Sequence, residues 1–201
     1  MSLETKLVDF FFELNSLNRL QRTGFAFLGA GGESVAAHSF QVVALAWVLG
    51  SLRSDVDGER LMTMALFHDL AETRTGDLNL VQKQYAQADE TLAVAEICKG
   101  LPFGDRIEQV LAEYAEGRSI EARLTNDADQ LALLLELKQM IDVGYAPPRR
   151  WIDPVCARLR TDLGRRFSQL ILAAHKDRWW MQLLDLAESH RKDIDTQNKN
   201  K

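Results

Sequence analysis

The chain has 201 residues, of which 46% are hydrophobic, and its formal net charge is −5 at pH 7. This length is enough for one domain with a sizeable core, and the acidic balance argues against a broad DNA- or RNA-binding surface, which requires clustered basic residues. Polar residues interrupt the longest apolar stretches well before the roughly 20 residues that a membrane-spanning helix needs. We therefore expect a cytoplasmic protein that binds neither nucleic acid nor membranes.

Apolar residues recur at spacings of three and four along most of the chain, and no segment alternates between apolar and polar residues as a half-buried strand does. The sequence therefore predicts an all-α fold. A Gly-rich loop is expected at residues 24–32, and Asp153 followed by Pro154 is typical of an N-cap and the first residue of a helix. We expect one domain over residues 1–190 and a disordered polar tail over residues 191–201. In chain order, the predicted helices cover residues 5–20, 34–52, 59–74, 80–99, 105–116, 119–143, 154–174 and 177–190.

The segment ALFHDLAETRTGD carries the clearest chemical signal. His68 and Asp69 are adjacent in it, and Glu72 follows four residues after His68, an offset that lies on one face of a helix. Imidazole and carboxylate groups together suit a first-row transition metal, although further ligands must come from elsewhere in the chain. His38 is a candidate because it occupies an apolar stripe, where an unpaired imidazole is costly to bury.

Three segments carry a resemblance to a known family: ESVAAHSFQVV, ALFHDLAETRTGDL and TNDADQLALLLE. They resemble segments of the HD-domain phosphohydrolases, and more narrowly of the branch of deoxyribonucleoside 5'-monophosphatases. The resemblance covers residues 11–140. It implies a single-domain HD-type helical bundle that hydrolyses the phosphate monoester of deoxyribonucleoside 5'-monophosphates. It also implies one divalent metal ion, either manganese, cobalt, zinc or magnesium, a small nucleotide as substrate, and a homodimer.

The resemblance also implies the metal ligands, which are His38, His68, Asp69 and Asp129. Asp127 is the alternative for the last ligand. We prefer Asp129 because the family pattern places the ligand directly before a polar residue and a Leu-rich helix.

Residues around the predicted metal site receive roles from the same resemblance. It implies acid/base or water-positioning roles for Glu72 and Asp77, without deciding which is the acid and which the base. The segment RTGF resembles a family segment RTGW, which implies that Arg22 contacts the substrate phosphate and that Phe25 lines the base or sugar pocket. Two features depart from the family: Ala37 stands where relatives usually carry an acidic residue, and the loop FLGAGGES lacks a basic residue.

Two other functions stay open. One is hydrolysis of guanosine polyphosphate alarmones, but that pattern usually reads HDxxED, and Thr73 stands here in place of the second acid. The other is a metal-free helical binding module, which the presence of all four expected ligands disfavours.

Overall fold

The computed structural model describes residues 1–184, and this part of the chain is all-α, as predicted. Its only strand-like feature is an isolated bridge between Gln21 and Ser34. The predicted tail at 191–201 and the end of the predicted helix 177–190 lie outside the described residues. Among the described residues, every helix is too short or too polar to cross a lipid bilayer. The helices are α1 (Leu3–Ser16), η1 (Thr23–Phe27), α2 (Val35–Ser51), α3 (Gly58–Phe67), α4 (Glu72–Thr75), η2 (Gln82–Gln84), α5 (Glu90–Cys98), α6 (Gly104–Glu116), α7 (Ile120–Asp142), α8 (Arg149–Ala157) and α9 (Asp162–Ala173).

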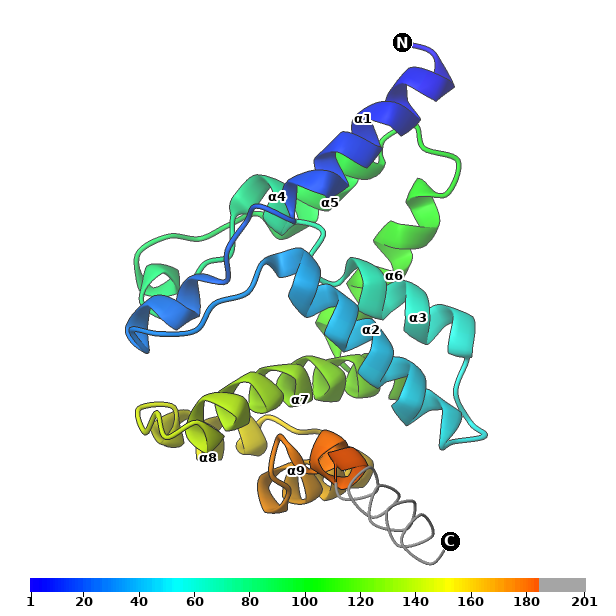
Figure 1. The fold of residues 1–201 in the computed structure, drawn as a ribbon. Helices are drawn as coiled ribbons and strands as arrows, with labels where there is room; N and C mark the ends of the chain where they lie inside the picture. The colour runs from blue at the N-terminus through cyan, green and yellow to red at the C-terminus, as the bar shows by residue number, and fades with distance from the viewer. Residues whose placement is uncertain (185–201) are drawn as a thin grey trace, which may run out of the picture.

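Helix α7 is the centre of the fold. It lies between α2 and α3 on one side and α8 and α9 on the other (Figure 1), and it contacts all four of these helices. Its buried residues are spread around most of its circumference, as is typical of a helix buried on several sides. The main hydrophobic core forms around it and includes Leu131, Leu134 and Leu137 of α7 together with Val42 of α2 and Leu61 of α3.

A second hydrophobic cluster lies between α1, α5 and α6 and includes Phe10, Ile97 and Ile107. Leu70 and Ala71, in the turn after α3, also belong to this cluster, whereas Leu61 and Ala65 of α3 belong to the main core. The end of α3 and the turn after it are therefore held from both sides, which fixes the position of the residues between them.

Four predicted helices have wrong bounds. The predicted helix 5–20 ends at Ser16. The predicted helix 59–74 ends at Phe67, where a turn over residues 68–71 separates α3 from α4. The predicted helix 80–99 begins only at Glu90, after the N-cap Asp89, whose side chain accepts a hydrogen bond from the Leu92 N–H.

The predicted helix 154–174 is two helices, and Pro154 lies inside the first of them rather than at its start. The break between α8 and α9 has a tertiary cause. The backbone N–H groups of Arg160 and Thr161 donate to the buried carboxylate of Asp127 on α7, at 2.6 and 2.9 Å, instead of continuing the helix.

Candidate metal centre

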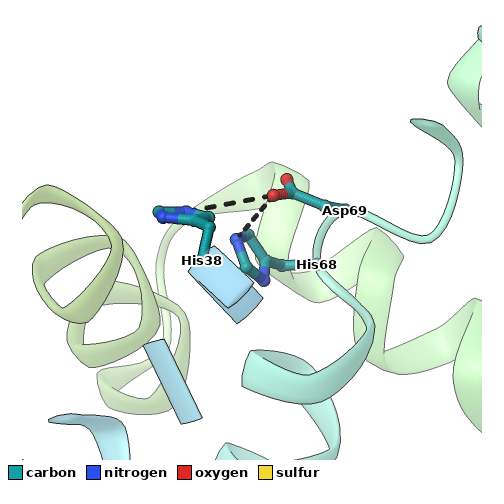
Figure 2. Close-up of side chains that lie close together, drawn as sticks. All are labelled: His38, His68 and Asp69. Carbon is teal, nitrogen blue, oxygen red and sulfur yellow. Dashed lines mark ion pairs between the residues drawn. The ribbon is translucent and has the colours of Figure 1, made fainter. Parts of the chain in front are cut away.

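Three side chains, one from α2 and two from the turn that follows α3, bring metal-binding atoms together beside α7. One ligand atom each from His38 on α2, from His68 at the end of α3 and from Asp69 lies within 4.8 Å of the others. Figure 2 shows the Asp69 carboxylate facing both imidazole rings, with its Oδ2 3.2 Å from Nε2 of His68 and 3.9 Å from Nε2 of His38. Adjacent residues on a regular helix point about 100° apart. Because α3 ends at Phe67, the turn lets His68 and Asp69 face each other.

Asp129 joins this group through His38. Its Oδ1 lies 3.0 Å from Nε2 of the fully buried His38 ring, and its Oδ2 accepts a hydrogen bond of 2.7 Å from the side chain of Gln130. The structure thus brings together all four residues that the sequence suggested as metal ligands.

Asp127, the alternative ligand, faces a different part of the fold. Its Oδ1 accepts a hydrogen bond from Arg160 N–H, and its Oδ2 accepts two from the N–H and hydroxyl of Thr161, at 2.9 and 2.6 Å. The carboxylate is completely buried, and both of its oxygens have donors from the chain. The geometry therefore favours Asp129 over Asp127 as a ligand.

The donor set has the properties of a cation site. His68 donates its Nδ1–H to the carbonyl of Ala65 at 2.9 Å, which directs Nε2 toward Asp69. Within the described part of the chain, Nε2 of His68 and Oδ2 of Asp69 are buried without a hydrogen-bond partner. Buried polar atoms are normally paired, so two unpaired ligand atoms side by side fit a bound cation.

The charges of the cluster shift its pKa values strongly. Burial favours the neutral ring of His68, but the charge of Asp69, its hydrogen bond to the ring and the charge of Asp129 together outweigh this effect and raise the pKa of His68 to about 9. Burial also opposes ionisation of Asp69, yet His68 and then Arg22 hold the pKa of that carboxyl well below its usual range. Since a histidine binds metal only through a neutral nitrogen, a bound cation would displace the proton of His68.

Arg22, Glu72 and Asp77 lie around the cluster. Nη1 of Arg22 is 3.6 Å from Oδ2 of Asp69, and the guanidinium is mostly buried. Oε2 of Glu72 is buried without a partner among the described residues, and burial together with the charges of Asp69 and Asp77 raises the pKa of Glu72 to about 8. Asp77 is engaged differently, because its Oδ2 accepts a hydrogen bond of 2.5 Å from the backbone N–H of Thr23.

Phe25 belongs to the main hydrophobic core. Its ring is buried there with Leu28 of the same segment, and its expected role in the base or sugar pocket stays a prediction. Conversely, sequence reasoning missed Glu33, whose Oε1 lies 3.5 Å from Nδ1 of His38. The available signal was its place in the ESV segment, five residues before His38, which the sequence analysis used only as a mark of resemblance.

The chain is similar in sequence to proteins of one family. Residues 14–171 match the family model of the HD domain. The 5'-deoxynucleotidase HDDC2 of Homo sapiens is 29% identical over 149 residues, which cover 71% of this chain and 72% of that protein. The 5'-deoxynucleotidase YfbR of Escherichia coli O127:H6 is 28% identical over 127 residues, which cover 56% of this chain and 63% of that protein.

Solved structures show the same fold. The PH0347 protein of Pyrococcus horikoshii OT3 is 27% identical, with a TM-score of 0.68 over 82% of this chain and 95% of that one. A protein of Magnetospirillum magnetotacticum MS-1, titled a predicted metal-dependent phosphohydrolase, is 22% identical, with a TM-score of 0.66 over 85% of this chain and 91% of that one.

Proposed function

The chain belongs to the HD domain family, and from that premise we propose that it is a metal-dependent phosphohydrolase acting on deoxyribonucleoside 5'-monophosphates. The observation that carries the proposal is a pair of ligand atoms beside the His38 ring, Nε2 of His68 and Oδ2 of Asp69, which are buried without a hydrogen-bond partner among the described residues. The activity named for the relatives HDDC2 and YfbR supports the substrate class.

We propose His38, His68, Asp69 and Asp129 as the residues that hold one divalent cation, with manganese, cobalt, zinc and magnesium as the candidate ions. When bound, such a cation polarises a phosphate oxygen and lowers the pKa of a water molecule. Two imidazoles and two carboxylates match the mixed nitrogen and oxygen chemistry of manganese, cobalt and zinc, whereas magnesium prefers oxygen ligands.

Arg22 is suited to bind the substrate phosphate. Its guanidinium is held beside Asp69, and a planar guanidinium can donate two parallel hydrogen bonds to phosphate oxygens. Burial favours loss of its charge, but the surrounding carboxylates, Asp69 first, more than compensate and raise the pKa of Arg22, so it stays fully charged.

Glu72 is better suited than Asp77 to transfer a proton. Oε2 of Glu72 is buried and has no hydrogen-bond partner in residues 1–184, whereas Oδ2 of Asp77 accepts hydrogen bonds from the backbone N–H and the hydroxyl of Thr23. A raised pKa keeps a proton on Glu72 near neutral pH, which it could give to the departing sugar oxygen. Asp77 would then position the Thr23 segment next to Arg22.

Phosphate release tests the proposal. Chelated protein resupplied separately with manganese, cobalt, zinc or magnesium is incubated with deoxyribonucleotides, ribonucleotides and guanosine polyphosphates, with Asp69→Ala as the control. We expect metal-restored phosphate release from deoxyribonucleoside monophosphates that is absent in the control. Pyrophosphate release from the polyphosphates would favour an alarmone hydrolase instead, and no turnover with any metal would favour a binding module.

We also propose that residues 1–190 form one domain and that the chain works as a cytoplasmic homodimer. Exposed aromatic side chains on α2, Phe40 and Trp47, support an association surface, since they are 75% and 61% exposed. Light scattering at several protein concentrations measures the mass, and a monomer at all of them would contradict the dimer.

A further inference from the structure

Glu33 is a buried carboxylate to which the proposed reaction assigns no role. Its side chain is 8% exposed, and neither of its oxygens has a hydrogen-bond partner of normal geometry within the described residues. Its Oε1 lies 3.5 Å from Nδ1 of His38, at the outer limit of a hydrogen bond. Because a buried carboxylate is costly without a donor or a positive charge, the His38 ring is its natural partner.

The two nitrogens of the fully buried His38 ring face different groups. Nε2 faces the cluster, 3.0 Å from Asp129 and 3.9 Å from Asp69, while Nδ1 faces Glu33. A histidine that binds metal through one nitrogen commonly donates its other N–H to a carboxylate, and this bond fixes both the tautomer and the orientation of the ring. Glu33 occupies the place of that carboxylate.

The backbone holds Glu33 in this place. The N–H of Arg22 donates to the carbonyl of Glu33 at 3.0 Å, and the next residue, Ser34, forms the bridge with Gln21. Ser34 also begins α2 as its N-cap, and its carbonyl accepts the N–H of His38 at 3.0 Å. One short pairing of two segments therefore positions both the Glu33 carboxylate beside the histidine and Arg22 beside Asp69.

We propose that Glu33 is a positioning residue: by accepting the Nδ1 proton of His38, it directs Nε2 of that ring toward Asp69 and Asp129. The part of this inference that concerns a bound cation rests on the proposed function. Glu33 itself would not touch the cation or the substrate.

Metal binding is the first test. Chelated wild-type protein, Glu33→Leu and Glu33→Gln are titrated with Co²⁺ by calorimetry, and the visible absorption of the bound cobalt reports its ligand geometry. Loss of an outer partner of a metal-binding histidine typically costs about 10–100-fold in affinity, so we expect this loss and an altered spectrum for Glu33→Leu. Glu33→Gln keeps an acceptor oxygen and should retain most of the affinity and the wild-type spectrum.

The matched control is Glu121→Leu. Glu121 is also a buried carboxylate, but it lies at the start of α7 and accepts a hydrogen bond from the N–H of Asp57. Its replacement should lower the melting temperature and leave cobalt affinity unchanged. Equal affinity and equal spectra for wild type and Glu33→Leu would overturn the inference.

A second measurement does not depend on the metal. In metal-free protein, nitrogen-15 NMR should detect a slowly exchanging Nδ1 proton on His38 in wild type and in Glu33→Gln, but not in Glu33→Leu. Wild-type protein that shows this proton yet binds no metal would support the positioning role and contradict the proposed function. A proton that exchanges equally fast in all three proteins would overturn the positioning role.

Discussion

Asp127 and Asp129 lie two residues apart on α7 and have opposite surroundings. Residues with this spacing point about 200° apart around a helix, so the two carboxylates face different sides. Asp127 faces the connection between α8 and α9, where backbone and hydroxyl donors occupy both of its oxygens. Asp129 faces His38 and the other charged groups of the cluster, and its side chain is 21% exposed.

The difference shows how the two roles of a buried acid can be separated. A carboxylate whose acceptors are all filled by the chain, as in Asp127, stabilises the fold and has no oxygen left for a ligand. Asp129, in contrast, lies in a cluster where atoms such as Nε2 of His68 have no hydrogen-bond partner among the described residues. A further positive group would satisfy such a cluster. Residue type and helix position alone do not distinguish these two cases.

The largest effect is expected from Asp129→Ala. Even outer partners of metal ligands contribute about 10–100-fold, so removal of a proposed ligand should lower metal-dependent phosphate release by more than about 100-fold. Initial rates with saturating metal, beside a far-ultraviolet circular dichroism spectrum that confirms folding, measure this effect. Wild-type rates in Asp129→Ala would remove Asp129 from the ligand set.

Asp127→Ala should lower the stability of the protein and leave its specific activity close to wild type. It leaves the buried donors of Arg160 and Thr161 without an acceptor, which should cost about 3–5 kcal/mol of stability. In a chain of this size the loss corresponds to a fall of about 10 °C in Tm. The specific activity of the protein that remains folded below that temperature should stay close to wild type. A loss of cobalt binding without a loss of stability would mean that Asp127, and not Asp129, is the metal ligand.

The sequence predicted those helices whose signals are local. The predicted ranges 34–52 and 119–143 agree with α2 and α7, because each helix begins with a serine N-cap next to a strong apolar pattern. The predicted helix 154–174 failed because its break depends on Asp127, more than thirty residues earlier in the chain. A single sequence contains no local sign of such a contact.

The site shows the same limit. His38, His68 and Asp69 could be named from their residue types and their resemblance to a family, and the structure brings them together. Glu33 was not named, because its place five residues before His38 in the ESV segment does not by itself show that its carboxylate is buried beside that ring. Phe25 is buried in the main core, and its role in a substrate pocket stays a prediction.

Gly164→Ala tests the surroundings of Asp127 with a smaller expected loss of stability than Asp127→Ala. A methyl group at Gly164, in the first turn of α9, would collide with the Asp127 carboxylate. Overpacking of this kind costs about 1–3 kcal/mol, which urea denaturation can measure. Cobalt affinity should be unchanged, because the displaced carboxylate lies on the side of α7 away from His38. A variant as stable as wild type would show that the Asp127 network tolerates displacement.

The pH dependence of the cluster arises on the Asp129 side. In the metal-free chain the pKa of His68 is about 9, above its usual value of 6.5, so its contribution to stability is complete below pH 6.5 and is lost as the pH rises through 9. The pKa of Glu72 is about 8, so folded protein keeps a proton that unfolded protein has released, and its contribution also falls as pH rises from about 4.5 to 8. The melting temperature of chelated protein should therefore decrease between pH 6.5 and 9.

Metal binding should show the opposite trend. A cation must displace the proton of His68, so its affinity should rise by up to about tenfold, or about 1.4 kcal/mol, per pH unit for each proton released. Calorimetry with Co²⁺ at pH 6.5, 7.2 and 8.0, in buffers of different ionisation enthalpy, counts the protons directly. The Asp127→Ala variant is the matched control and should keep the same slope, since its carboxylate touches none of the titrating groups. An affinity that is independent of pH would mean that His68 is already neutral in the metal-free protein. The Asp127 and Asp129 sides of α7 would then differ in their hydrogen bonds and not in their protonation.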